Sequence, residues 1–397
     1  MSPLRFLTSG ESHGLEVLAI LEGMPAGLAL SPDDIQPDLA RRQGLSREGK
    51  PYAGASARMK VERDQVEIAG GVMGGQTIGA PIALRVRNLD HDKWIGRAVA
   101  PMTIPRPGHA DLTGAVKYGF DDLRYTLERA SARETTARVA VGAACRKLLA
   151  EFGVRVGSYV TEIGDVSAEL EELMLDERLE RAEASELRCP VPQATEAMQA
   201  RIREAMAARD TLGGVFEVVA LGVPPGLGSH VHWDRRLTAR LAAAVMSIHA
   251  IKGVEIGDGF ANARKPGTLV HDEIFVEEGW LVRRTNRAGG LEGGISNGQP
   301  IVVRAAMKPL STTLSPLRSV DLATGAPAPM EYERSDFCAV PRACVVGEAM
   351  VCFVLADALL DKLGGDSIAE MRPRFETVRQ LRLEDLQMLG EPTVFWP

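Results

Sequence analysis

An internal repeat constrains the fold of this chain more than any other feature of its sequence. Residues 70–85 read GGVMGGQTIGAPIALR, and residues 289–304 read GGLEGGISNGQPIVVR. Five glycines, one proline, the isoleucine after it and the last arginine coincide, and each copy ends in a run rich in β-forming residues. We therefore predict that each copy is a glycine turn leading into a strand, over 82–86 and 301–304.

A long helix is predicted downstream of each copy, over 130–153 and 340–364. Apolar residues of the first are spaced for one helix face, whereas 345–360 is almost wholly apolar and must be covered on every side. Both helices close with a glycine, which suits a helix C-terminus. Because turn, strand and helix recur in order, we infer one domain over 1–397, built from halves at about 1–155 and 215–365.

Two charged segments fall outside these halves. Residues at about 165–210 are rich in Glu and Arg with helical spacing, and they predict a solvated helical insertion. Residues at about 370–391 predict a charged C-terminal helix. We expect catalytic residues in neither segment.

Composition places the chain among ordinary globular proteins, with 45% hydrophobic and 25% charged residues. No run of about 18 apolar residues is present, which argues against a membrane span, and the N-terminus lacks the build of a signal peptide. Five scattered cysteines without a C-x-x-C pair suit a reducing compartment, and we predict no metal site. A net charge of −7 argues against nucleic acid as a partner. We expect a cytoplasmic protein.

The first candidate for chemistry is residues 10–14, which read GESHG and match G-x-S-x-G, the nucleophile turn of α/β-hydrolases. That turn follows an inner strand of an established sheet, whereas only one short strand, 4–8, precedes it here. We therefore favour a tight turn after the first strand that presents Ser12 and His13 to a ligand. A serine hydrolase that uses Ser12 is the rival enzyme class.

A second histidine lies in a comparable turn, residues 106–111, which read RPGHAD. One histidine is more often structural than catalytic. Two histidines in glycine turns, one beside Arg106, favour proton transfer, because imidazole exchanges protons near neutral pH. His109 and His13 are therefore candidate proton donors.

Arginines gather in residues 124–138. Arg129, Arg133 and Arg138 are predicted to lie roughly on one helical stripe, with Glu134 placed to pair with Arg138. The stripe is either a salt-bridged face or a site for a ligand with several negative charges, which arginine binds through paired hydrogen bonds.

Two further segments follow the second glycine turn. Residues 308–313 read KPLSTT and suit a phosphate loop, although neither a Walker A loop nor a G-x-G-x-x-G dinucleotide turn is present. In residues 333–343, Ser335 and Asp336 suit a helix N-cap, between Arg334 and Arg342. Asp336 is either the partner in an ion pair or a proton relay.

Taken in this order, the five segments resemble the chorismate synthase family, and the resemblance runs from residue 5 to about residue 364. It implies an α+β fold, a β-α-β sandwich with apolar helices buried between sheet layers, assembled as a homotetramer. It also implies a lyase that converts 5-enolpyruvylshikimate 3-phosphate to chorismate and phosphate by 1,4-elimination, the last step of the shikimate pathway. The cofactor would be reduced FMN, which supplies electron density to expel phosphate.

The same resemblance implies roles for single residues. His13 would protonate the departing phosphate, His109 would protonate the reduced flavin, and Asp336 would assist proton removal through flavin N5. Contacts with FMN would come from Arg129, Ala130, Ser131, His249, Ala250, Gly294, Lys308, Pro309, Leu310, Ser311, Thr312 and Arg334. Substrate or NADPH would be bound by Arg42 and Arg47, to which we add Arg106, Arg133 and Arg342 for the substrate's carboxylates and phosphate.

Two positions depart from the family pattern. Residue 249 is His where many relatives have Gln or Asn, and residues 48–54 replace a basic run, which aligns Arg47 less securely than Arg42. This loop is either a lid or a plain surface turn. NADPH is a candidate reductant, but the sequence has no readable nicotinamide motif, which favours an external source of reduced flavin. A non-enzymatic flavin- or phosphate-binding descendant is a further alternative, against which the intact His13, His109 and Asp336 argue.

Overall fold

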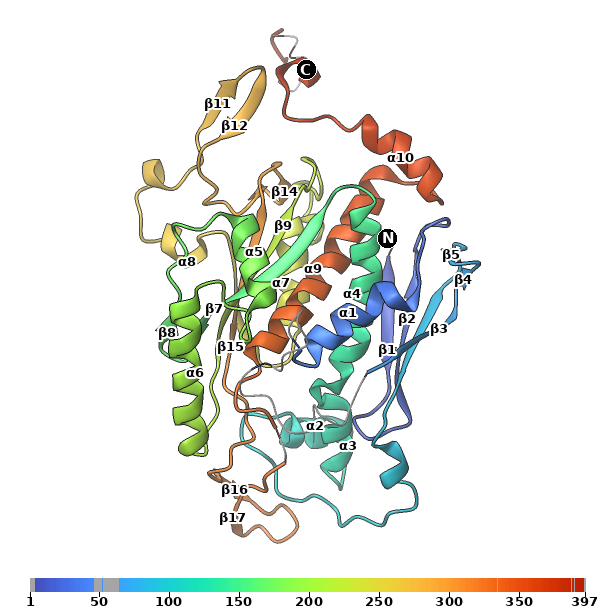
Figure 1. The fold of residues 1–397 in the computed structure, drawn as a ribbon, viewed down its shortest axis with the longest axis vertical. Helices are drawn as coiled ribbons and strands as arrows, with labels where there is room; N and C mark the ends of the chain where they lie inside the picture. Colours follow the sequence, from blue (N-terminus) through green and yellow to red (C-terminus); the bar gives the residue numbers. More distant parts are fainter. Residues whose placement is uncertain are drawn as a thin grey trace.

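The computed structural model describes residues 4–45, 52, 64–333, 335–386, 388 and 390–395. Helices and strands are both abundant, in agreement with the predicted mixed class (Figure 1). Two antiparallel sheets lie on opposite sides of a helical layer, and this arrangement is visible in Figure 1.

The N-terminal sheet has the strand order β1-β2-β6-β3. Alternation sets its two faces: Ile82, Leu84 and Val86 of β6 are buried, whereas Arg85 between them is exposed. The first glycine turn forms the small hairpin β4–β5 and leads into β6, as predicted. The bounds are β1 (Arg5–Ser9), β2 (Glu16–Glu22), β3 (Val66–Gly70), β4 (Val72–Met73), β5 (Gln76–Thr77) and β6 (Ile82–Arg87).

The C-terminal sheet has the order β10-β15-β9-β7-β8. The second glycine turn forms the hairpin β13–β14 and leads into β15, which confirms the second predicted strand. The bounds are β7 (Arg155–Ile163), β8 (Val166–Ser167), β9 (Gly214–Leu221), β10 (Ile251–Ile256), β13 (Leu291–Glu292), β14 (Ile295–Ser296) and β15 (Ile301–Met307).

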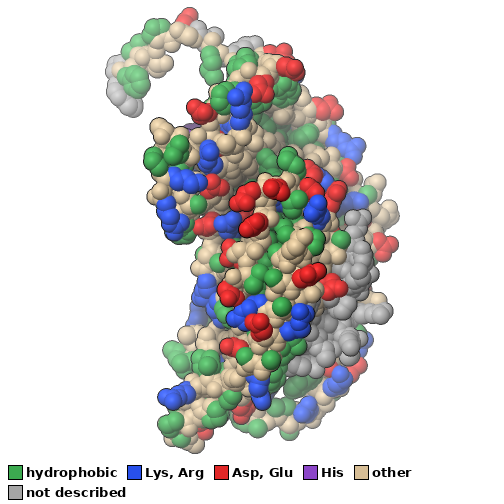
Figure 2. Space-filling view, turned by 60° about the vertical axis from the view of Figure 1, so that its left-hand side comes forward, with side chains coloured by type: hydrophobic (Ala, Val, Ile, Leu, Met, Phe, Trp, Pro, Cys, Tyr) green, Lys and Arg blue, Asp and Glu red, His purple; other side chains and the backbone are tan. Residues whose placement is uncertain are grey.

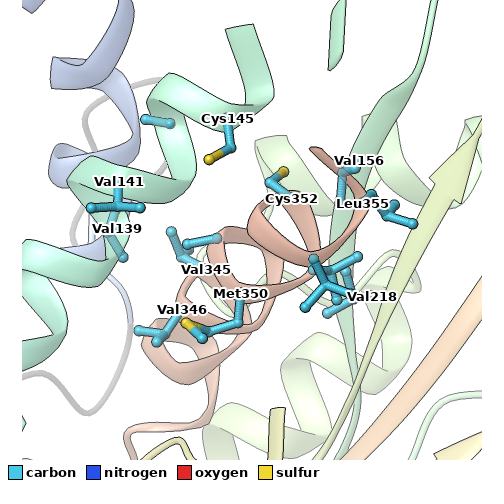
Figure 3. Packing of buried hydrophobic residues seen from close by; sticks show 14 of the residues in the cluster. Val139, Val141, Cys145, Val156, Val218, Val345, Val346, Met350, Cys352 and Leu355 are labelled. Carbon is cyan, nitrogen blue, oxygen red and sulfur yellow. The ribbon is translucent and has the colours of Figure 1, made fainter. Parts of the chain in front are cut away.

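The helical layer consists mainly of α1 (Pro32–Arg42), α4 (Thr135–Ala150), α7 (Leu237–Met246) and α9 (Val340–Leu363). Helix α4 packs on β2 and β6, α9 packs on β7 and β9, and the two helices pack on each other. In Figure 3, side chains of both helices and of the C-terminal sheet meet in the interior, among them Val139 of α4, Met350 of α9 and Val218 of β9. Cys145 and Cys352 fill this core as free thiols.

Helix α9 matches the predicted 340–364 closely, and it ends at Gly364. It is long and apolar enough to cross a membrane, although no such run was expected from the sequence. Because 94% of its apolar window is buried inside the fold, the helix serves as a core helix here. The acidic Glu348 and Asp357 interrupt the run, and both are buried.

The remaining elements surround this core. The predicted insertion contains two helices. The segment from 110 to 134, which continues from the 106–111 turn, contains short helices. The bounds are α2 (Asp111–Tyr118), α3 (Arg124–Ala130), α5 (Leu175–Ala184), α6 (Pro192–Ala207), α8 (Gly259–Asn262), α10 (Ile368–Glu376), β11 (Ile274–Glu277), β12 (Trp280–Arg283), β16 (Arg318–Val320) and β17 (Pro327–Pro329), with 3₁₀ turns at His91–Lys93, Ala132–Glu134, Trp233–Arg235, Gly267–Leu269 and Leu383–Asp385.

Two predicted helices are wrong in extent. The helix expected from residue 130 begins at Thr135, because Ser131 is extended and its side chain accepts the amide of Arg133. The charged C-terminal helix ends at Glu376, because the chain beyond it follows β12: the carbonyl of Leu381 accepts the amide of Leu281 at 2.7 Å.

The approach of α4 to α9 depends on a glycine. A Cβ added to Gly142 would lie 2.3 Å from both Cα and Cβ of Ala349. We expect Gly142→Ala to lower the free energy of unfolding by roughly 1–3 kcal/mol, the usual cost of overpacking a core. Gly253→Ala is the control, since its added Cβ meets Ala306 at an ordinary 3.5 Å. Urea unfolding of both variants checks the prediction, and equal stabilities would contradict it.

Candidate active site

A cavity of about 450 Å³ opens where the N-terminal ends of α4 and α9 come together. Two helix N-termini favour negative charge, because their first backbone N–H groups lack partners within the helix. The lining comes from the turn after β1, the end of α1, the 106–109 turn, the segment before α4, the 248–250 segment and the loop after β15.

Most of the predicted site residues meet in this cavity. Those among its lining are His13, Arg42, Arg106, His109, Ser131, Arg133, His249, Ala250, Leu310, Ser311, Thr312, Asp336 and Arg342. Segments separated by more than 300 positions in the chain therefore form one site.

The side chain of Glu128, a residue of α3, holds His13 in place. Nδ1 of the His13 ring lies 2.7 Å from one carboxylate oxygen of Glu128, and the backbone amide of His13 donates to the other at 2.9 Å. The ring also packs against Trp94, with ring centroids 4.3 Å apart. Burial raises the pKa of Glu128, but the hydrogen bonds from His13 outweigh it and bring that pKa below its ordinary value.

His109 is held by Asp111, whose side chain is fully buried. Its Nδ1 lies 2.5 Å from the carboxylate, which also accepts from the guanidinium of Arg106 at 2.8 and 3.0 Å. Burial raises the pKa of Asp111, but the contacts with His109 and Arg106 lower it by a larger amount. The pKa is therefore below its ordinary value, and the carboxyl stays ionised.

Two arginines share one buried carboxylate, that of Asp64. Arg133 contacts it at 2.5 Å and Arg42 at 3.4 Å. Arg42 also donates to Thr135 at 2.9 Å, and Arg133 donates to Asn88 at 2.7 Å. Arg42 and Arg133 thus lie together at the cavity lining, and guanidinium groups bind carboxylate and phosphate through paired hydrogen bonds.

Asp336 forms an ion pair with Arg342, whose Nε donates to the carbonyl of Arg42 at 2.9 Å. The prediction of an N-cap here is wrong, since the N-cap of α9 is Ala339. Ser335 instead donates to the carbonyl of Thr312 at 3.0 Å and ties this segment to the loop after β15.

His249 is the unusual residue of the lining. Its Nδ1 is buried and has no hydrogen-bond partner in the part of the chain that the structure describes. Burial lowers the pKa of His249, nearby Glu134 raises it and Arg138 lowers it again, with a net decrease. The next residue, Ala250, has φ +65°, a strained conformation of the kind that occurs at functional sites.

Some predicted residues lie elsewhere. Arg129 donates to the carbonyls of Gly10 and Thr8, Gly294 lies in the β13–β14 turn against Arg236, and Lys308 approaches Gly108. Ala130 and Pro309 are likewise outside the lining. Arg47, Arg334 and most of the 48–54 loop lie outside the described residues.

The predicted arginine stripe is wrong. Arg129, Arg133 and Arg138 belong to three successive elements, α3, the 3₁₀ turn at Ala132–Glu134 and α4, because the chain turns at Ser131. The predicted pair of Glu134 and Arg138 is confirmed, at 2.8 Å.

Sequence reasoning passed over the acidic partners and the ring that packs on His13. Glu128 and Asp111 stood within quoted motifs, but only their contacts with the two histidines make them part of the candidate site. Asp64 and Trp94 had no signal in the sequence, since neither belongs to a motif.

Among the residues that the structure describes, Ser12 does not have the basic partner that a nucleophile needs. Its Oγ lies 3.2 Å from Oγ of Ser131, while the neighbouring His13 directs Nδ1 to Glu128. Within the described residues, no group of three or more His, Cys, Asp or Glu side chains could hold a metal ion.

Comparison with known proteins agrees with this geometry. A family model described as chorismate synthase matches residues 4–360. Chorismate synthase of Aquifex aeolicus is 54% identical over 94% of this chain and 96% of its own, and that of Rubrobacter xylanophilus is 53% identical over 94% and 95%. A crystal structure of chorismate synthase is 48% identical with a TM-score of 0.76, covering 94% of this chain and 96% of that one. The chain therefore belongs to the chorismate synthase family.

Proposed function

We propose that this cavity binds reduced FMN together with 5-enolpyruvylshikimate 3-phosphate and eliminates phosphate to give chorismate. A member of this family is a lyase, and the reaction is the last step of the shikimate pathway. One observation carries the proposal: two histidines, each bonded to a carboxylate that is buried or largely buried, share a cavity with four arginines. The arginines match a substrate with phosphate and carboxylate groups.

The residues present fit a flavin. The unpaired Nδ1 of His249 offers a hydrogen bond, and the cavity volume lies in the range of about 300–1,000 Å³ typical of cofactor sites. Ser131, His249, Ala250 and residues 310–312 would hold it. Roles for Arg129, Ala130, Gly294, Lys308, Pro309 and Arg334 stay predictions. When bound, reduced FMN supplies the electron density that helps to expel phosphate.

The chain's own residues divide the proton transfers. His13 gives a proton to the oxygen of the departing phosphate, and His109 is the second proton donor. Asp336, steadied by Arg342, assists removal of the ring hydrogen. Arg42, Arg106, Arg133 and Arg342 bind the anionic groups of the substrate, and Arg47 stays a prediction.

The proposal predicts phosphate release. With reduced FMN and 5-enolpyruvylshikimate 3-phosphate under anaerobic conditions, the purified protein should form chorismate and phosphate in equal amounts. The same mixture without protein is the control. Absence of phosphate release would refute the proposal.

The catalytic rate should depend strongly on both cavity histidines. We expect His13→Ala and His109→Ala each to lower kcat by roughly 10–10⁴-fold, the range for lost acid–base catalysis and positioning. His232→Ala is the matched control, because that exposed histidine also pairs with a carboxylate, Asp234, but lies outside the cavity lining. Near-normal kcat in both cavity variants would contradict their assigned roles.

We propose that reduced flavin comes from an external source, because no nicotinamide motif is readable in the sequence. When NADPH and oxidised FMN are added anaerobically to the protein and 5-enolpyruvylshikimate 3-phosphate without a reductase, no chorismate should then form. Product under these conditions would show that the protein reduces its own flavin.

We further propose a single domain of two pseudo-repeated halves, since hairpin, strand and long helix follow in the same order in each.

The outer face of the N-terminal sheet carries exposed apolar side chains. Leu7 and Ile20 are 77% and 45% exposed there, and they line an apolar depression. Such a surface favours association with further copies, in agreement with a homotetramer. Analytical ultracentrifugation should show that the parent protein forms a complex of four copies and that Leu7→Glu forms a smaller one. A monomeric parent protein would contradict this proposal.

A cytoplasmic location, without nucleic acid or membrane as partner, completes the proposal. Acidic and basic side chains are intermingled on the face shown in Figure 2, and this pattern does not favour nucleic-acid binding. The long apolar helix α9 is buried in the core.

A further inference from the structure

Both carboxylate oxygens of Glu128 are directed at one residue, His13. One accepts the backbone amide at 2.9 Å, and the other lies 2.7 Å from Nδ1 of the ring. The backbone carbonyl of Glu128 also accepts the amide of Ser12 at 3.1 Å. Both side chains are largely buried, at 18% and 17% exposure. Glu128 therefore sets the position of this turn and the orientation of the imidazole.

The same contact decides which ring nitrogen carries hydrogen. An ionised carboxylate can only accept, so Nδ1 must be the donor, and a neutral ring then has its lone pair on Nε2. Glu128 is ionised near neutral pH, since hydrogen bonds from His13 outweigh burial and hold its pKa below the ordinary value. Nε2 is thus the nitrogen left for a ligand in the cavity.

We propose that Glu128 is a positioning residue for the elimination, because it holds His13 with hydrogen on Nδ1 and so reserves Nε2 for proton transfer. The inference rests on the proposed role of His13. The ring acts as the acid in its imidazolium form, which carries hydrogen on both nitrogens. As the substrate's C–O bond breaks, its electron pair stays with the phosphate oxygen, which takes the proton from Nε2. The ring is left neutral with hydrogen on Nδ1, the form that Glu128 stabilises.

Comparison with other carboxylates near the cavity supports this assignment. Glu134 contacts Arg138 at 2.8 Å and Thr8 at 2.8 Å, so it anchors a cation and a hydroxyl. Asp111 divides its oxygens between His109 and Arg106. Glu128 instead gives both oxygens to the histidine that it positions.

Glu128→Gln tests the proposal, because the amide can keep the turn while it reverses the tautomer. Its oxygen can accept the backbone amide of His13, and its NH₂ group then faces Nδ1, which must become an acceptor. We expect the ring hydrogen to move to Nε2 and kcat to fall by roughly 10²–10⁴-fold with little change in KM. Nitrogen NMR of ¹⁵N-histidine-labelled protein, with the His13 signals assigned by His13→Ala, reports the tautomer.

The control is Asp122→Asn, at the start of the same helix. Asp122 accepts the amides of Met102 and Arg124 at 3.0 and 2.8 Å, which are structural contacts. This variant should keep near-parental kcat and the parental tautomer. An equal loss of kcat in the two variants would show that Glu128 acts only by holding α3, and would overturn the proposal.

Two further outcomes separate this inference from the proposed function. If the neutral ring of His13 in the unaltered protein carries hydrogen on Nε2, the inference is wrong, whether or not the variants fold. If His13→Ala keeps normal kcat while the parental ring carries hydrogen on Nδ1, the contact is real but the catalytic role of His13 fails, and the inference fails with it.

Discussion

The buried carboxylate of Glu348 is the interaction on which the rest of the structure depends. It lies fully buried on α9 and binds Arg41 of α1 at 2.7 Å, Arg188 at 2.8 Å and Arg146 of α4. Burial alone would raise its pKa, but the three arginines hold it well below the ordinary value. Leaving any of these charges unpaired would cost several kcal/mol, so the helices of the central layer are stable only when assembled together.

The same assembly builds the cavity. Arg42 follows Arg41 at the end of α1, and Arg342 precedes Glu348 on α9 by less than two helical turns. Thr135, which binds Arg42, is the first residue of α4. Because the ion network fixes the three helices, their ends carry cations to one place. The position of the arginines that line the cavity is therefore a consequence of how the core is neutralised, as well as of the surrounding loops.

Sequence reasoning succeeded where a property is local or periodic. The repeated glycine turns, the strands after them and the apolar α9 follow from turn chemistry and hydropathy, and the structure contains all of them. It failed where a neighbour decides the outcome. Ser131 breaks the expected helix through a single hydrogen bond, and beyond Glu376 the chain pairs with β12 at Leu381 and Arg382 instead of continuing as a helix. Most candidate site residues were identified from motifs and family resemblance, but Asp64 and Trp94 belong to no motif.

By itself, the sequence determined the two glycine turns, the strands that follow them and the apolar helix of the core, and it supplied the histidines and arginines of the candidate site. Those features depend on composition, spacing and motif, which are written along the chain. Only the tertiary structure decided which carboxylate meets which cation or imidazole: Glu128 with His13, Asp111 with His109, Asp64 between Arg42 and Arg133. Such pairs join distant segments, and electrostatic contacts act over a few ångströms of space, whatever the separation in sequence.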